Sequence, residues 1–174
     1  MSHTAGFPAE YTPEGPREEM AHEQSLVDGF PEMEMQFRLG KGYLYSNWGI
    51  RLASLVDEKV TCEQFSKLAQ ERIIGPLGMS RTTFDLHIVA TYPLCLGHLE
   101  ENGEFKVFHE IQENPARHAA GGLFSNAVDL CRLARCLLNE GLSDRGVRLL
   151  EKSSIDEMKQ ARGQTSTSAA YGIT

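Results

Sequence analysis

Tyr45 and Asn47, which flank Ser46, are the residues of this 174-residue chain whose types and spacing could do chemistry. A phenol with a pKa of about 10 can accept a proton when nearby cations stabilise its anion and lower that pKa. An asparagine amide offers a donor and an acceptor together, which suits the binding of an amide substrate. The same short pattern also fits a packed aromatic residue followed by a helix cap, so on its own it leaves both interpretations open.

The residues after Asn47 predict the helix that must hold this pair in place. Apolar residues recur there at helical spacing, namely Trp48, Leu52, Leu55 and Val56. The opposite side carries Arg51, Ser54 and Glu58, so the pattern indicates an amphipathic helix that begins near Trp48. Ser46 and Asn47 are both good N-cap residues, and we expect the side chain of one of them to accept a backbone N–H at the helix start.

A second helix is predicted to begin near Cys62. Thr61 and Gln64 have the spacing of a capping box, and apolar residues follow on one face, namely Phe65, Leu68, Ala69 and Ile73. Pro76 and Gly78 should end this helix. Farther along, Asn102-Gly103 between two strand-like runs favours a β-hairpin with a type I′ turn.

The last third of the chain predicts a core helix. Ser125 is the expected N-cap of a helix over residues 127–139, whose apolar residues cover most of its circumference, so we expect it to be buried on most sides. Ser153 should cap a short helix that ends near residue 160. Near the other end, residues 17–27 suggest a short helix, and Gly40 and Gly42 either make a turn or leave room for a ligand.

Four segments in the same order resemble the serine β-lactamase family, in the class C branch that includes related penicillin-binding proteins and esterases. Residues 2–8 read Ser-His-Thr-Ala-Gly-Phe-Pro, residues 45–47 form the Tyr-x-Asn motif, residues 73–83 contain Pro-Leu-Gly-Met, and residues 120–130 read Ala-Gly-Gly-Leu-Phe-Ser-Asn-Ala-Val-Asp-Leu. In a complete member a serine attacks a lactam or ester carbonyl, and water later releases the acid from the acyl-enzyme. The resemblance implies that Tyr45 is the tyrosine that shuttles the proton of the nucleophile. It makes Asn47 the residue that binds the lysine partner and the substrate amide.

Two catalytic motifs of the family do not occur in this sequence. No serine is followed three residues later by lysine, and no Lys/His-Thr/Ser-Gly is present. We therefore expect residues 1–174 to be a single incomplete domain, an internal fragment of a serine hydrolase that is inactive alone. The alternative is a non-catalytic binding or interaction module derived from the same fold. The expected fold class is α+β: the mostly helical portion of a β-lactamase/transpeptidase-like fold with a β-hairpin, with most of the antiparallel sheet missing.

The charge and hydropathy of the sequence limit the kinds of partner that the chain is expected to bind. The net charge of −7 and the lack of a Lys/Arg run argue against nucleic acid and against a polybasic membrane anchor. No run approaches the roughly 18 apolar residues of a membrane span, and no signal peptide precedes the motifs, so the chain as written is expected to be cytoplasmic, with its localisation otherwise unknown. The expected partner is a small-molecule acyl substrate, such as a β-lactam, a D-amino-acid peptide or an ester, once the domain is completed. Uncovered apolar faces should favour self-association.

No metal or other cofactor is expected. The cysteines, Cys62, Cys95, Cys131 and Cys136, lack the spacing of a zinc or disulfide framework, and we interpret them as buried thiols. The six histidines are scattered and form no zinc-protease motif.

Overall fold

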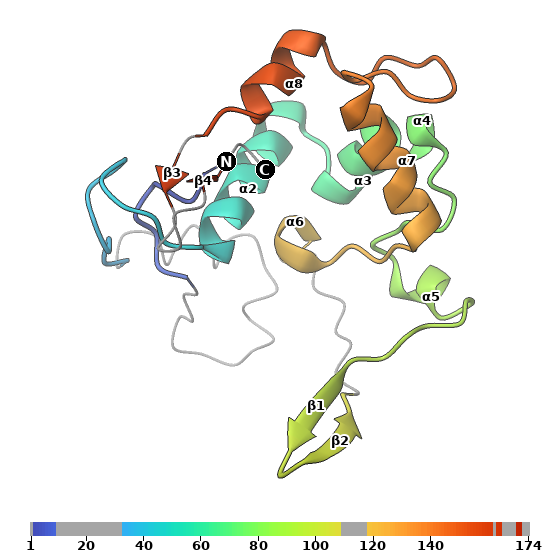
Figure 1. Ribbon diagram of the computed structural model, residues 1–174, viewed down its shortest axis with the longest axis horizontal. Helices are drawn as coiled ribbons and strands as arrows, with labels where there is room; N and C mark the ends of the chain where they lie inside the picture. The colour runs from blue at the N-terminus through green and yellow to red at the C-terminus, as the bar shows by residue number, and fades with distance from the viewer. Residues whose placement is uncertain (1, 10–32, 109–117, 162, 165–169, 172–174) are drawn as a thin grey trace.

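The computed structural model describes residues 2–9, 33–108, 118–161, 163–164 and 170–171. Its helices are α2 (Asn47–Thr61), α3 (Phe65–Ala69), the π-helix η2 (Gln70–Ile74), α4 (Gly75–Leu77), α5 (Leu86–Val89), α6 (His118–Gly121), α7 (Ala127–Leu138) and α8 (Lys152–Met158). Its strands are β1 (His98–Glu101), β2 (Glu104–Val107), β3 (Gly163–Gln164) and β4 (Ala170–Tyr171). The fold is thus a mostly helical α+β arrangement with a hairpin, as the sequence predicts (Figure 1).

Helix α2 begins where the sequence predicts. Ser46 is the N-cap, with an extended backbone, and its hydroxyl accepts the Gly49 backbone N–H at 3.1 Å. The buried face, however, is rotated from the predicted one, because Arg51 is buried and Val56 is 61% exposed. Trp48 and Leu55 are buried as predicted and pack with Met33, Phe7 and Leu52 in one of the two core clusters.

The predicted start of the second helix is wrong. Thr61 is the last residue of α2 rather than an N-cap, and its hydroxyl donates to the Asp57 carbonyl at 2.7 Å. The chain turns at Cys62, whose φ is +57°, before α3 begins at Phe65. The cap comes from α2 instead, because the Glu58 carboxylate accepts the Phe65 N–H at 2.6 Å. A carboxylate from the preceding helix satisfies an N-terminal N–H as well as a local side chain does.

The π-helix η2 changes which isoleucine reaches the core. A π-turn holds one more residue than an α-turn, so it moves the buried face along by one position. Ile74 is accordingly only 4% exposed, whereas Ile73, the residue that a regular helix would bury, is 42% exposed. Pro76 lies in the first turn of α4 and does not stop the helix; Gly78, with a φ of +67°, ends it.

The second core cluster forms around this corner. Its buried members are Ile74, Leu77, Met79, Phe84 and Cys136, with Phe65, Ala69, Leu133 and Leu149 packed against them. Residues 77 and 79 therefore anchor the Pro-Leu-Gly-Met segment in the core. The cluster joins the region from α3 to α4 with α7, while the short helix α6 packs against α2 and α3.

Helix α7 is buried on one side only, so the prediction of a helix buried on most sides is wrong. Of its residues only Asp129 and Cys136 are buried. An apolar stripe is exposed along the helix at positions 127, 130, 131, 134 and 138, and Leu138 is 76% exposed. Apolar composition predicted contact on all sides, but among the described residues no element covers this stripe.

Two helix caps also differ from the predicted ones. Asn126, not Ser125, caps α7, because the Asn126 side chain accepts the Asp129 N–H at 2.9 Å. Glu151 occupies the N-cap position of α8, and Ser153 lies inside that helix. Serine and asparagine have similar cap preferences, so propensity alone could not choose between neighbours.

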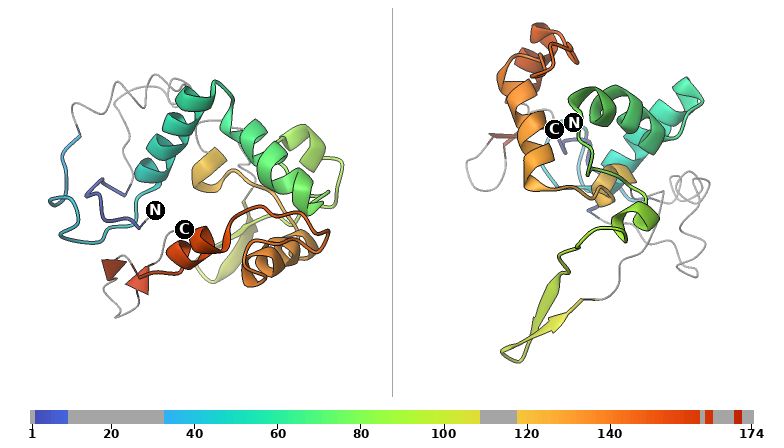
Figure 2. Two further views of the ribbon diagram at one scale, coloured as in Figure 1. Left: turned by 90° about the horizontal axis from the view of Figure 1, so that it is seen from above. Right: turned by 90° about the vertical axis from the view of Figure 1, so that its right-hand side faces the viewer.

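The hairpin of β1 and β2 forms around Asn102-Gly103, as predicted. Both turn residues have positive φ, +54° and +83°, which a type I′ turn requires. Strand pairing is antiparallel, with Glu101 opposite Glu104 next to the turn. Every residue of both strands is exposed, and the hairpin projects away from the helices (Figures 1 and 2).

The remaining predictions about turns, thiols and helices have different outcomes. Gly40, with a φ of +72°, lies in a turn in which the Lys41 N–H donates to the Arg38 carbonyl, so the turn interpretation holds. Cys62, Cys95 and Cys131 are exposed, so three of the four thiols are not buried as expected. The helix expected over residues 17–27 lies outside the described residues. No described helix has the length and apolar character needed to cross a bilayer.

Candidate functional site

The segment that leads into α2 is held by the chain's first residues. Segment 2–9 lies beside residues 36–47 and is joined to them by backbone hydrogen bonds. The Gln36 N–H donates to the Gly6 carbonyl at 2.8 Å, and the Gly40 N–H donates to the Thr4 carbonyl at 2.8 Å. Two motif segments that are about 40 residues apart in the sequence therefore form one local structure.

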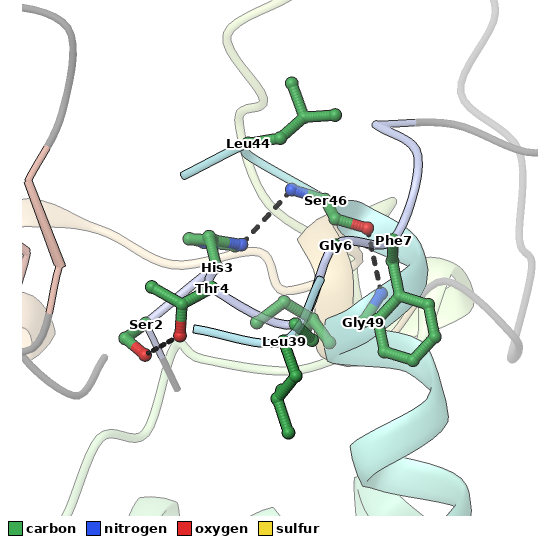
Figure 3. Close-up of a pocket in the computed structure, with 11 residues that line it drawn as sticks. Ser2, His3, Thr4, Gly6, Phe7, Leu39, Leu44, Ser46 and Gly49 are labelled. Carbon is green, nitrogen blue, oxygen red and sulfur yellow. Dashed lines mark hydrogen bonds between the residues drawn. The ribbon is translucent and has the colours of Figure 1, made fainter. Parts of the chain in front are cut away.

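Ser46 is the centre of this contact (Figure 3). Its backbone N–H donates to Nδ1 of His3 at 3.1 Å, and its hydroxyl donates to the Pro8 carbonyl at 2.6 Å. The same hydroxyl accepts the Gly49 N–H, so it joins the start of α2 to segment 2–9. The middle residue of Tyr-x-Asn is thus 3% exposed and fully engaged, and it fixes the positions of its two neighbours.

Tyr45 and Asn47 extend from this fixed point. The Tyr45 side chain is exposed, with 48% of the residue accessible, and its ring lies against the His3 imidazole with 4.5 Å between centroids. Asn47 is the first residue of α2, half-buried, and its backbone N–H donates to the Ala9 carbonyl at 3.1 Å. A half-exposed phenol one residue before a capped helix can meet a reactant from outside this chain.

His3 is neutral in this arrangement. Because Nδ1 accepts the Ser46 N–H, the proton of the neutral ring resides on Nε2. Burial also lowers the pKa of the His3 imidazole from its usual value, because the charged form loses hydration. The residue has a φ of +54°, a conformation in which histidine and asparagine are enriched among residues other than glycine.

A pocket of about 280 Å³ lies beside the same segment, and eleven residues line it: Ser2, His3, Thr4, Ala5, Gly6, Phe7, Leu39, Leu44, Ser46, Gly49 and Ile50. Leu44 and Ser46, the chain neighbours of Tyr45, belong to this lining, whereas Tyr45 does not. Within the described ranges, no group of three or more His, Cys, Asp or Glu side chains gathers in a way that could hold a metal ion.

A second buried polar site joins the other two motif segments. Asp129 of α7 is 1% exposed, and its carboxylate accepts the Arg81 N–H at 2.8 Å and the Thr82 hydroxyl at 3.0 Å. The Arg132 guanidinium pairs with the same carboxylate and also donates to the Gly78 carbonyl at 2.8 Å. These bonds hold residues 78–82 against the N-terminal half of α7, so this carboxylate has a structural role.

Comparison with known proteins places these motif segments in one family. The profile of the family described as Beta-lactamase matches residues 1–172. The chain belongs to the β-lactamase family. The resemblance carried by the four sequence segments is therefore confirmed, and the family is that of the serine β-lactamase-related proteins.

Curated proteins similar to this chain carry the names of different enzymes. A putative D-alanyl-D-alanine carboxypeptidase of Escherichia coli O157:H7 is 24% identical over 99% of this chain and 44% of its own length. An N-acetylmuramyl-L-alanine amidase of Bacillus subtilis (strain 168) is 23% identical over 90% of this chain and 40% of its own length. The chain thus spans less than half the length of these curated relatives.

Solved β-lactamase-like structures share the fold. The octameric penicillin-binding protein homologue from Pyrococcus abyssi matches 99% of this chain and 41% of its own chain, with a TM-score of 0.76 and 20% identity. The class C β-lactamase from Rhodobacter sphaeroides matches 99% and 45%, with a TM-score of 0.72 and 20% identity. The arrangement described above is therefore part of a β-lactamase/transpeptidase-like fold, with most of the sheet outside this chain.

For this β-lactamase family member, sequence reasoning missed two residues that join motif segments far apart in the sequence: His3 in the candidate site and Asp129 in the second polar site. His3 and Asp129 both lie within the matching segments, but their partners are 43 and 48 residues away. A signal was available in the sequence, because each of the two is the one titratable side chain in its motif segment. Local periodicity, which guided the assignment of helices, carries no information on such distant contacts.

Proposed function

We propose that this chain supplies the Tyr-x-Asn part of a serine hydrolase site that acts on an acyl substrate. The observation that carries the proposal is the anchoring of Ser46, which presents Tyr45 half-exposed and Asn47 at a helix start. In the completed site, the Tyr45 phenol would transfer the proton of the serine nucleophile. The Asn47 amide would bind the lysine partner and the amide of the substrate.

The isolated chain is proposed to be inactive. Its sequence contains neither Ser-x-x-Lys nor Lys/His-Thr/Ser-Gly, so Tyr45 has no nucleophile to deprotonate and no lysine to stabilise its anion. Residues 1–174 would then form a single incomplete domain. The names of its relatives, a carboxypeptidase and amidases among them, fit D-amino-acid peptides and amides as substrates alongside β-lactams and esters.

The test uses a completed protein, in which the chain is joined in frame to a segment containing Ser-x-x-Lys upstream and one containing Lys/His-Thr/Ser-Gly downstream. These segments come from flanking coding sequence or from a complete family member. The completed protein should slowly hydrolyse a chromogenic ester or cephalosporin. Replacing Tyr45→Phe should lower its rate about 10²–10⁴-fold, the usual contribution of a general base.

Tyr92→Phe is the matched control, because Tyr92 lies far from Ser46 in the sequence and its ring stacks under the Arg81 guanidinium at 4.2 Å, a contact that phenylalanine keeps. It should leave the rate within about threefold. Robust turnover by the 174-residue chain alone, or a completed protein indifferent to Tyr45→Phe, would contradict the proposal.

A second candidate function is a non-catalytic binding module that keeps the shape of the site without its nucleophile. The lack of Ser-x-x-Lys in this sequence favours it. Such a module should bind an acyl compound through Asn47 without turning it over, in a way that isothermal calorimetry with a D-alanyl-D-alanine peptide can measure. Binding that Asn47→Ala weakens, together with no turnover by any completed protein, would favour this alternative.

A further inference from the structure

His3 contacts three consecutive residues just before α2: Leu44, Tyr45 and Ser46. Its backbone carbonyl accepts the Leu44 N–H at 3.1 Å, its ring lies on the ring of Tyr45, and its Nδ1 accepts the Ser46 N–H at 3.1 Å. His3 is therefore bonded to the backbone N–H of the residue before Tyr45 and of the residue after it, and its ring lies against the ring of Tyr45.

The direction of the Tyr45 ring depends on the neighbours that contact it. Tyr45 is 48% exposed, and an exposed aromatic side chain can change rotamer on a picosecond to nanosecond timescale unless a neighbour holds it. The His3 ring stands 4.5 Å away at 36° to the tyrosine ring and at 85° to the ring of Tyr43. Aromatic contacts of this geometry favour one ring orientation over others. His3 is thus placed to favour the ring orientation of Tyr45 found in the structure, in which the residue is half-exposed.

His3 is not itself suited to take a proton from a reactant. Its Nδ1 lone pair is occupied by the Ser46 N–H, and its Nε2 carries the ring proton. An imidazole bonded in this way cannot accept a proton at Nδ1, but it can orient the residues that it contacts.

We propose that His3 is a positioning residue for Tyr45, which fixes the phenol in the direction required for proton transfer. The proposal rests on the proposed function of Tyr45. It assigns a role to the Ser-His-Thr-Ala-Gly-Phe-Pro segment, whose other contacts hold the backbone: Gly6 and Thr4 bond to residues 36 and 40, and Pro8 bonds to Ser46. A misplacement of about 1 Å in a catalytic group can cost on the order of 10²-fold in rate, so the effect should be measurable.

The experiment is a double-mutant cycle on kcat and KM in the completed protein, with His3→Ala and Tyr45→Phe made singly and together. His3→Ala should lower kcat by roughly 10- to 100-fold and change KM less than about threefold. In the Tyr45→Phe background, the same substitution should cause a much smaller loss, because the phenol that His3 positions has been removed and only the bond to Ser46, which also holds Asn47, is still affected. Ser2→Ala is the control, since it removes only the Ser2–Thr4 hydroxyl bond of 3.0 Å in the same segment.

His3→Asn separates positioning from folding. The Asn side-chain oxygen can replace Nδ1 as the acceptor for Ser46, and asparagine tolerates a φ of +54°. It should restore part of the rate lost in His3→Ala. If the alanine variant does not fold, the cycle is run with His3→Asn, whose smaller loss should again depend on Tyr45.

Nuclear magnetic resonance of the 174-residue chain adds a readout besides activity. The His3 ring should be the Nε2–H tautomer, and His3→Ala should shift the Tyr45 ring protons and the Ser46 amide, whereas Ser2→Ala should shift neither. Equal losses of kcat for His3→Ala with and without Tyr45 would overturn the positioning role alone. Full activity of the Tyr45→Phe protein would instead overturn the proposed function, so the two failures are distinguishable.

Discussion

Replacing the Asp129 carboxylate by an amide, Asp129→Asn, should destabilise the chain far more than the same change in an exposed ion pair. The Asp129 side chain is 2% exposed and accepts bonds from Arg81, Thr82 and Arg132. An amide of the same size can keep its oxygen toward one side of this site, but its NH₂ group then faces donors on the other. Bonds to a charged group contribute about 1.5–3 kcal/mol each, and breaking a buried pair costs about 3–5 kcal/mol.

The expected loss lies at the lower end of that range, about 3 kcal/mol, because the Arg132 side chain is 37% exposed and can be hydrated when its partner changes. The control is Asp144→Asn. Asp144, which lies after the end of α7, pairs with Arg135 of α7 at 3.0 Å. The Asp144 side chain is 35% exposed, unlike that of Asp129. Exposed pairs contribute about 0–1 kcal/mol, so the control should lose less than about 1 kcal/mol.

Urea unfolding measures the difference, followed by far-UV circular dichroism and by the fluorescence of Trp48, which lies in the other core cluster. With a urea m-value of about 1–3 kcal/mol/M, the Asp129→Asn midpoint should fall by roughly 1–3 M. A free energy of unfolding for Asp129→Asn within about 1 kcal/mol of that for Asp144→Asn would refute the reasoning. It would mean that the buried carboxylate does not hold residues 78–82 to α7.

Three further outcomes are expected. Gly6→Ala should lower the free energy of unfolding in urea by roughly 2–4 kcal/mol, because a Cβ there would lie 2.3 Å from a backbone carbonyl oxygen. Gly40→Ala, also at positive φ but with open space around it, should lower it by only about 1–2 kcal/mol. Equal losses would show that the backbone strain of positive φ alone matters. Ile74→Ala should cost about 2–5 kcal/mol and Ile73→Ala less than about 1 kcal/mol, and the reverse order in thermal melts would disprove the π-turn. Since burial lowers the pKa of His3 in the folded chain, the unfolded chain binds protons more readily, so the free energy of unfolding should fall as the pH drops below about 6.5; a His3→Asn chain with the same pH dependence would contradict this.

The sequence predicted the elements whose signals are local. The Asn102-Gly103 pair predicted the hairpin, because only a few residue types adopt the two positive φ angles of its turn. Cap preference and apolar spacing predicted a helix that begins near Trp48 with Ser46 or Asn47 as its cap, and in the structure Ser46 is the cap and Asn47 the first residue of α2. The family was also within reach, because its motifs occur in order along the chain.

What the sequence could not predict depends on contacts between distant segments. Arg51 occupies a buried position that charge alone assigns to solvent, and a single π-turn exchanges the roles of Ile73 and Ile74. Cys131 was expected to be buried because thiols usually are, yet it lies on the exposed stripe of α7. For the site, Tyr45 and Asn47 could be singled out from the sequence and remain proposals, whereas the contacts of His3 required the structure.

The π-turn also bears on which changes of chain length the protein can accept. The Gly75 N–H reaches back five residues to the Gln70 carbonyl, one more than in an α-helix. Removing Ile73, which is exposed, would convert this bond into an ordinary α-helical one and leave Ile74 in the place of the deleted residue, still facing the core. Removing one residue from the middle of α7 would instead rotate everything after it by about 100° and take Cys136 out of the core. Residues 70–74 are thus the part of the helical body where a homologue can be one residue shorter without repacking.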